Sequence, residues 1–161
     1  MFSKKDILRS LYSLGTTVSI ILSLQQPALA TIGQTADTVE SDRAQFDGSS
    51  STTVTHEAQF TVYTFTANGS DIKEYVDDSN NTVFAITWRG LSHPDLTNLL
   101  GSHYVAYSAK MAQQPKATVR KSTNIKTSSL HIQRGGHMRD WHGSVVMTSL
   151  LPAGVTESDL K

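Results

Sequence analysis

The chain has 161 residues, of which 38% are hydrophobic, and its 14 basic residues balance its 14 acidic residues. It contains no cysteine, which excludes a disulfide framework, a thiolate metal site and a lipid attached to cysteine. After removal of a targeting segment, this size predicts one globular domain that folds on a single hydrophobic core.

Residues 1–30 have the pattern of a secretory signal peptide. Three basic residues precede an apolar run over residues 11–24, and Ala28-Leu29-Ala30 offers the small residues of a cleavage site. The apolar run is too short for a permanent membrane anchor, which takes about 20 apolar residues. We therefore expect a mature chain without an anchor that begins at Thr31. Because the chain must fold without disulfides, the bacterial periplasm is the first expected destination and secretion the second.

Residues 31–57 are predicted to form a polar N-terminal segment or linker. A run of serine and threonine within it has too little apolar surface to order itself. A short helix is predicted before that run, over residues 36–45, with Val39 and Phe46 as its apolar face. The single globular domain is then expected to occupy residues 58–161.

β-Branched and aromatic residues predict strands in this domain, punctuated by turn residues. The predicted strands cover residues 60–65, 72–76, 83–88, 117–120, 129–133, 137–141 and 144–148. Asn68-Gly69 is typical of a two-residue hairpin turn. The strand over residues 83–88 is apolar on both faces, which predicts a central position in the sheet.

One main helix is predicted between the two groups of strands. Its start is indicated by Ser92 and Asp95 with a proline between them, and Pro115 ends it. Its apolar stripe consists of Leu96, Leu99, Leu100, Tyr104, Tyr107 and Met111. Antiparallel strands on both sides of one helix favour an α+β fold, with a sheet of six to seven strands and this helix packed on it.

Several short motifs occur in an order that resembles a known bacterial family. The motifs are Lys73-Glu74-Tyr75-Val76, Val83-Phe84-Ala85-Ile86-Thr87-Trp88-Arg89-Gly90, Pro94-Asp95-Leu96, Leu99-Leu100-Gly101, Tyr104, Gly135-Gly136-His137-Met138-Arg139 and Leu150-Leu151-Pro152-Ala153-Gly154-Val155. Over residues 54–160 the chain resembles the exported family called domain of unknown function 2844. Leu91 departs from the family pattern, which commonly has proline there. The resemblance implies an exported globular domain of a Gram-negative bacterium, and it implies no reaction, ligand or catalytic residue.

The segment over residues 135–143 concentrates polar, cationic and aromatic groups beside glycines, as binding loops do. With the central strand and the helix start expected nearby, the candidate binding residues are Trp88, Asp95, His137, Arg139, Trp141 and His142. The alternative is that this segment is a plain hairpin, in which Trp141 packs against the fold and Arg139 pairs with an acidic residue. The sequence leaves both interpretations open.

Histidines raise the question of a metal site. His131, His137 and His142 lie within twelve residues and His56 precedes Glu57, but their spacing does not place two histidines on one face of a strand. The first two meet only if a hairpin turns at the two glycines between them. No nucleophile elbow is present, and no paired carboxylates occur outside a turn. We therefore predict no metal ligand, cofactor or catalytic residue.

Opposite charges are segregated along the chain. Nine acidic and two basic residues lie between Asp37 and Asp78, whereas seven basic residues and no acidic residue lie between Lys110 and Arg139. The two groups either neutralise each other across the fold, in surface pairs worth under about 1 kcal/mol each, or leave a basic face for an anionic partner. Residues 111–140 contain no aromatic side chain for base stacking, which argues against nucleic acid.

Three functional hypotheses follow. The first is a non-catalytic binding or accessory domain that acts on an unknown protein or cell-envelope component. The second is a metal-binding protein or an enzyme that uses the histidines and Glu57. The third is an envelope protein that binds an anionic polymer through the basic segment.

Overall fold

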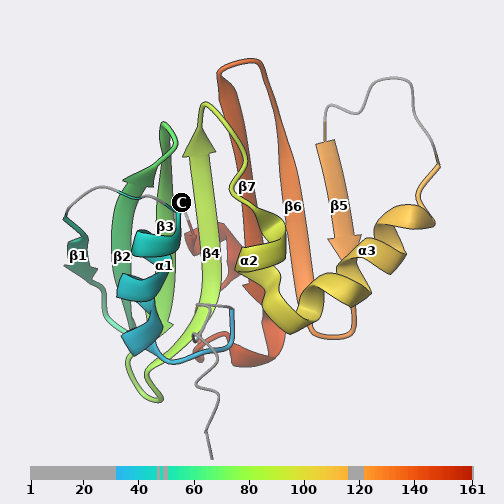
Figure 1. The fold of residues 1–161 in the computed structure, drawn as a ribbon. Helices are drawn as coiled ribbons and strands as arrows, with labels where there is room; N and C mark the ends of the chain where they lie inside the picture. Colours follow the sequence, from blue (N-terminus) through green and yellow to red (C-terminus); the bar gives the residue numbers. More distant parts are fainter. Residues whose placement is uncertain (1–31, 47, 49–50, 116–121, 161) are drawn as a thin grey trace, which may run out of the picture.

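Figure 1 shows a seven-stranded sheet with helices packed on one face. The computed structural model describes residues 32–46, 48, 51–115 and 122–160. The strand order is β1-β2-β3-β4-β7-β6-β5, and each neighbouring pair is antiparallel. The expected signal peptide and the strand predicted over residues 117–120 lie outside the described residues.

The elements have the following bounds. The strands are β1 (Thr53–His56), β2 (Phe60–Ala67), β3 (Ser70–Asp77), β4 (Thr82–Gly90), β5 (Ser122–Lys126), β6 (Leu130–His137) and β7 (Asp140–Met147). The α-helices are α1 (Val39–Gln45), α2 (Leu96–Leu100) and α3 (Tyr104–Ala112). The 3₁₀ turns are η1 (Ala36–Thr38), η2 (Gly101–His103), η3 (Thr148–Leu150) and η4 (Glu157–Asp159).

This architecture confirms the predicted α+β fold and the size of its sheet. The predicted central strand is β4, the middle strand of seven, and Phe84 and Ile86 within it are at most 1% exposed. The hairpin turn between β2 and β3 lies at Asn68-Gly69, whose φ angles of 52° and 73° suit this residue pair. No helix in the described part of the chain is long and apolar enough to span a membrane.

The predicted helix is present, but it begins later than expected and is interrupted. Asp95 is the N-cap residue, because its carboxylate accepts a hydrogen bond of 2.8 Å from the Thr97 backbone N–H. Ser92 instead contacts Ser70 at the end of the sheet. Gly101, with a φ of 48°, ends α2, and the chain resumes as α3 after η2. The predicted apolar stripe nevertheless faces the sheet and packs in its core.

The predicted strand over residues 137–141 is wrong, because the chain turns within it. Strands β6 and β7 pair from His137 and Asp140 onward, so the turn lies at Met138-Arg139. The two glycines that suggested a turn are part of β6. A Cβ atom on Gly136 would lie 2.1 Å from the Asp140 carbonyl oxygen, so this position needs glycine for close backbone approach within the pair.

The N-terminal segment contributes two elements to the fold. The helix predicted over residues 36–45 is present as η1 and α1, and Val39 and Phe46 are both buried, as expected. The segment predicted to be polar also contains β1, whose alternating threonine, valine and histidine pair with β2. The composition of residues 31–57 did not indicate this strand, because β1 is stabilised by pairing with β2, which lies outside that segment.

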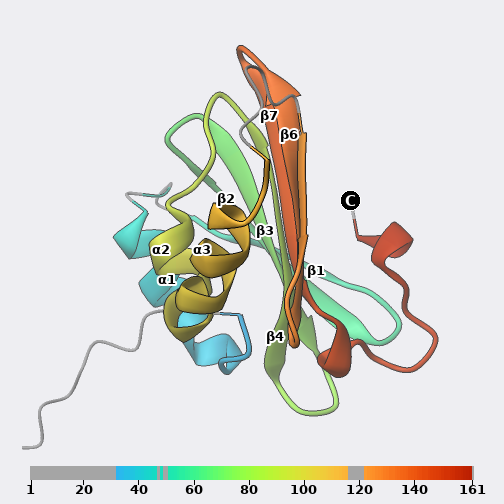
Figure 2. The same cartoon turned by 90° about the vertical axis from the view of Figure 1, so that its right-hand side faces the viewer.

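Apolar side chains form clusters on both faces of the sheet. Figure 2 shows the helices on one side of the sheet and the C-terminal segment on the other. On the helix face, α1, α2 and α3 cover a large cluster that includes Phe65, Ile72 and Trp88. On the second face, residues 148–160 cover a smaller cluster around Phe84. Each fully buried side chain of this size contributes about 1.5–3 kcal/mol to folding, so the helix face supplies most of the stabilisation.

Candidate functional site

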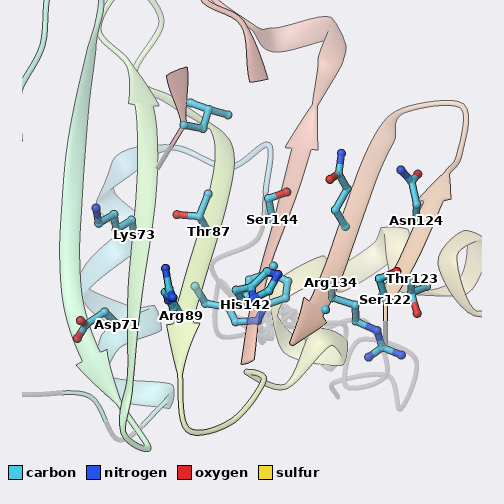
Figure 3. A pocket seen from close by; sticks show the side chains of 15 residues that line it. Asp71, Lys73, Thr87, Arg89, Ser122, Thr123, Asn124, Arg134, His142 and Ser144 are labelled. Atoms are coloured by element: carbon cyan, nitrogen blue, oxygen red, sulfur yellow. The ribbon is translucent and has the colours of Figure 1, made fainter. Parts of the chain in front are cut away.

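The second face of the sheet is only partly covered. Apolar side chains of the C-terminal segment pack against one end of this face, where Tyr75, Phe84 and Val146 lie. Beyond Leu160, a hollow of about 680 Å³ extends across β3, β4, β7, β6 and β5. We call this uncovered part the open face (Figure 3).

Strand register aligns polar side chains across the open face in two rows. The first row consists of Lys73, Thr87, Ser144, Gln133 and Asn124, one from each strand in spatial order. The second row consists of Asp71, Arg89, His142, Gly135 and Ser122. Figure 3 shows Lys73, Thr87 and Ser144 on the neighbouring strands β3, β4 and β7, and Asn124 on β5, beyond β6. Because neighbouring strands are about 4.8 Å apart, a ligand that crosses them along the first row meets a polar side chain on each strand, while the second row is interrupted at Gly135.

These rows follow from the alternation of side chains along each strand. In β3, Asp71 and Lys73 face the open side, while Ile72 between them is buried under the helices. In β4, Thr87 and Arg89 flank the buried Trp88 in the same way. In each of these strands, alternate side chains therefore pack in the core or lie on the open face.

The open face carries both charge signs. The Arg89 guanidinium donates hydrogen bonds of 2.9 and 3.3 Å to the two carboxylate oxygens of Asp140. Hydrogen bonding from Arg89 holds the pKa of the Asp140 carboxyl below its usual range. Gly135 has no side chain, which deepens the second row between His142 and Ser122. The face is thus a mixed array of donors and acceptors and not a uniformly basic patch.

Two of the six predicted binding residues are aromatic and lie on the helix face. Trp88 is 2% exposed, and its Nε1 donates a hydrogen bond of 2.8 Å to Nδ1 of His93. The ring centre of Trp141 lies 5.0 Å from that of His93. Gly143 makes room for this arrangement, because a Cβ atom there would lie 2.2 Å from the Trp88 ring. Trp141 therefore packs on the fold, as the plain-hairpin interpretation expected.

The other four predicted residues are dispersed. Asp95 caps α2, and His137 and Arg139 are exposed at or beside the β6–β7 turn. His142 lies in the second row of the open face, and with Trp88 it is one of two predicted residues that border the hollow. Arg89, and not Arg139, binds the acidic residue of this hairpin.

The family comparison covers nearly all of the described fold. Residues 28–160 match the family model described as protein of unknown function (DUF2844). The chain belongs to this family. The match confirms the resemblance inferred from the motifs and extends it from residue 54 back to residue 28. No curated protein and no solved structure matches the chain.

The histidines of this DUF2844 protein do not converge. His56 contacts Thr61, while His131 lies 2.7 Å from a Glu157 carboxylate oxygen on the covered part of the second face. His131 and His137 do not meet, because the chain turns two residues later than the glycines. The described residues contain no group of three or more histidine, aspartate or glutamate side chains that could hold a metal ion.

The sequence of the DUF2844 protein did not identify most residues of the open face as candidates for binding. Arg89, Gln133 and Ser144 belong to strands whose apolar residues were used to predict the core. The signal that could have found them is the polar residue at every second position, as in Asp71-x-Lys73 and Thr87-x-Arg89. These alternations become one surface only when the order β3-β4-β7-β6-β5 is known.

Proposed function

We propose that this protein is an exported, non-catalytic binding domain, and that its open face binds a hydroxyl-rich polymer of the cell envelope, such as a polysaccharide. The observation that carries this proposal is the pair of polar rows that cross five strands beside a 680 Å³ hollow. Hydroxyl, amide and charged groups at regular strand spacing suit a polymer that repeats its own donors and acceptors.

The placement of these groups on strands favours binding. Thr87 and Ser144 have short side chains, so they lose little rotamer entropy when a ligand orders them. The strands below them are fixed by the core on the helix face, which holds the rows in position. Binding is favoured over catalysis or metal binding because, among the described residues, the histidines and Glu57 do not form a group of three or more that could hold a metal ion.

Export is part of the proposal and rests on the signal-peptide pattern of residues 1–30. N-terminal sequencing of the protein from a periplasmic fraction tests it. A mature terminus at Thr31 is expected, and an intact Met1 in the cytoplasmic fraction would contradict export.

Affinity electrophoresis in gels that contain dextran, xylan or polygalacturonate tests polymer binding. We expect at least one polysaccharide to retard the protein, and the double variant Lys73→Gln/Ser144→Ala to lose most of that retardation. Each substitution removes a hydrogen-bonding group of the first row, and such groups contribute about 0.5–3 kcal/mol each. The matched control is Lys110→Gln/Ser102→Ala, which makes the same chemical changes at exposed positions on the helix side.

Each outcome decides between the hypotheses. Retardation by polygalacturonate alone, if salt abolishes it and the double variant retains it, favours the basic segment and an anionic polymer instead. Migration unchanged in all three gels contradicts polysaccharide binding. Equal loss in the test and control variants contradicts the placement of the site on the open face.

A further inference from the structure

A second hollow, of about 370 Å³, lies on the helix side of the sheet. It opens between the start of α2, the outer part of α3 and β6. We call it the α3 groove and define it by Asp95, Leu96, Tyr104, Tyr107, Met111 and Arg134. Its lining includes Asp95, one of the predicted binding residues, and Arg134, which also borders the hollow of the open face.

Arg134 brings a positive charge into the α3 groove. It lies on the same face of the sheet as Trp88 and Gly143, and its guanidinium carbon is 6.0 Å from the ring centre of Tyr107. This distance is at the limit of a cation–π contact. The side chain is held against α3 while its charged end borders the groove.

No carboxylate neutralises this charge within the described part of the chain. The ion pairs there involve Arg43, Arg89, His131 and His137, and none involves Arg134. Asp95 lines the same groove, but its carboxylate is engaged in capping α2. A half-buried guanidinium without a carboxylate partner retains most of its capacity to bind an anion.

Besides Asp95, the titratable groups nearest Arg134 are His93 and Tyr107, and neither adds a negative charge. Burial, and then the charges of Arg134 and His142, lower the pKa of His93. The Nδ1 atom of His93 accepts a hydrogen bond from Trp88, so this ring is neutral with its proton on Nε2. Burial raises the pKa of the Tyr107 hydroxyl, which therefore stays protonated near neutral pH.

One part of the groove wall is aromatic and apolar, beside the polar side chains of Asp95, Thr97 and Ser108. Leu96 is 8% exposed, and the rings of Tyr104 and Tyr107 lie 5.9 Å apart at an angle of 46°. Met111 continues the wall one turn further along α3. One cation beside aromatic and thioether surface suits a ligand with one negative charge and a flat apolar body.

We propose that the α3 groove binds a small organic carboxylate, with the carboxylate on the Arg134 guanidinium and an aromatic body against Tyr104, Tyr107 and Met111. The planar guanidinium matches a carboxylate in a bidentate arrangement. The carboxylate of Asp95 in the same groove disfavours a second negative charge on the ligand. The site shares Arg134 with the edge of the open-face hollow, but binding of the carboxylate does not require a polymer on the open face.

The probes are 3-phenylpropanoate, its uncharged analogue 3-phenylpropanamide, and inorganic phosphate, each titrated into the full mature domain and followed by amide NMR shifts. We expect saturable binding of 3-phenylpropanoate, with a dissociation constant on the order of 1 mM or below for a ligand of this size. The amide should bind at least about tenfold more weakly, since it lacks the charge. Shifts should be confined to the groove, at Tyr107 and Ser108, and absent at Gln133.

The variant Arg134→Gln should weaken 3-phenylpropanoate binding by at least about tenfold, while the control Arg139→Gln at the exposed turn should leave it unchanged. Equal affinity for the amide, shifts outside the groove, or no saturation up to about 10 mM would each overturn the proposal. Phosphate that competes as strongly as 3-phenylpropanoate would overturn the assignment to a carboxylate. If Arg134→Gln does not fold, the NMR shifts of the unmodified domain still show whether 3-phenylpropanoate binds in the α3 groove.

Discussion

The two faces of the sheet are built from the same strands and differ in what covers them. On the helix face, α1, α2 and α3 close over large apolar side chains, and Trp88 and Ile72 are at most 2% exposed. On the second face, residues 148–160 cover one end and leave polar side chains at the other. The helix face therefore supplies most of the stability, while part of the second face presents polar side chains that no other element covers.

The largest expected effect is the loss of an apolar side chain from the helix face. Leu100 is 0% exposed at the end of α2, so Leu100→Ala leaves a cavity under the helices. We expect the free energy of unfolding to fall by about 2–5 kcal/mol. Urea denaturation of the variant and of the unmodified protein measures this difference in the free energy of unfolding. A loss below about 1 kcal/mol would mean that the helices contribute little to stability, contrary to the comparison.

The helix face also buries a pair of carboxyl groups, which predicts a pH dependence. Glu74 of β3 is 1% exposed and lies near Asp42 of α1, which is 2% exposed. Burial, followed by the charge of Asp42 and a hydrogen bond with it, raises the pKa of Glu74 well above its usual range. The folded protein therefore holds a proton that the unfolded chain has released. This contribution to stability is present below the unfolded pKa and is lost as pH rises through the folded pKa.

The variant Glu74→Gln removes this titration while keeping the size of the side chain. We expect the variant to be more stable than the unmodified protein at pH 8, by roughly 1 kcal/mol or more, because it folds without taking up a proton or burying a charge, and one pKa unit of difference between the folded and unfolded states corresponds to about 1.4 kcal/mol. Its advantage should shrink toward pH 4. Urea denaturation at both pH values measures this, with the exposed Glu57→Gln as the control. An advantage that does not change with pH would refute the assignment.

A smaller effect is expected where the C-terminal segment is attached to the second face. His131 is 7% exposed, and Glu157 holds it with a contact of 2.7 Å. Glu157→Gln weakens this charge-assisted contact and should cost about 1 kcal/mol of stability. Hydrogen exchange should also rise at Leu160, and not in α3. Unchanged exchange in residues 148–160 would show that apolar packing alone holds the segment.

The smallest effect on stability is expected on the open face. Lys73→Gln/Ser144→Ala changes two half-exposed polar side chains that belong to neither apolar cluster, so the free energy of unfolding should change by less than about 0.5 kcal/mol. The same variant is expected to lose polymer retardation. A loss of stability as large as that of Leu100→Ala would place these residues in the fold and not in a binding surface.

The sequence predicted the features that depend on neighbouring residues. The turn at Asn68-Gly69, the apolar stripe of the main helix and the central strand β4 all follow from local periodicity, and the structure has each of them. The turn at Met138-Arg139 did not follow, because the glycine signal before it serves close strand pairing. Nor did the open face, whose rows exist only after β4 pairs with β7.

That pairing of β4 with β7 also has a consequence for folding kinetics. Every other strand pair joins sequence neighbours, so β1–β4 and β5–β7 can each form as a local meander. The first meander lies in the acidic part of the chain and the second in the basic part. We therefore expect the β4–β7 seam to close last, as an encounter between oppositely charged halves that electrostatic attraction accelerates and salt slows.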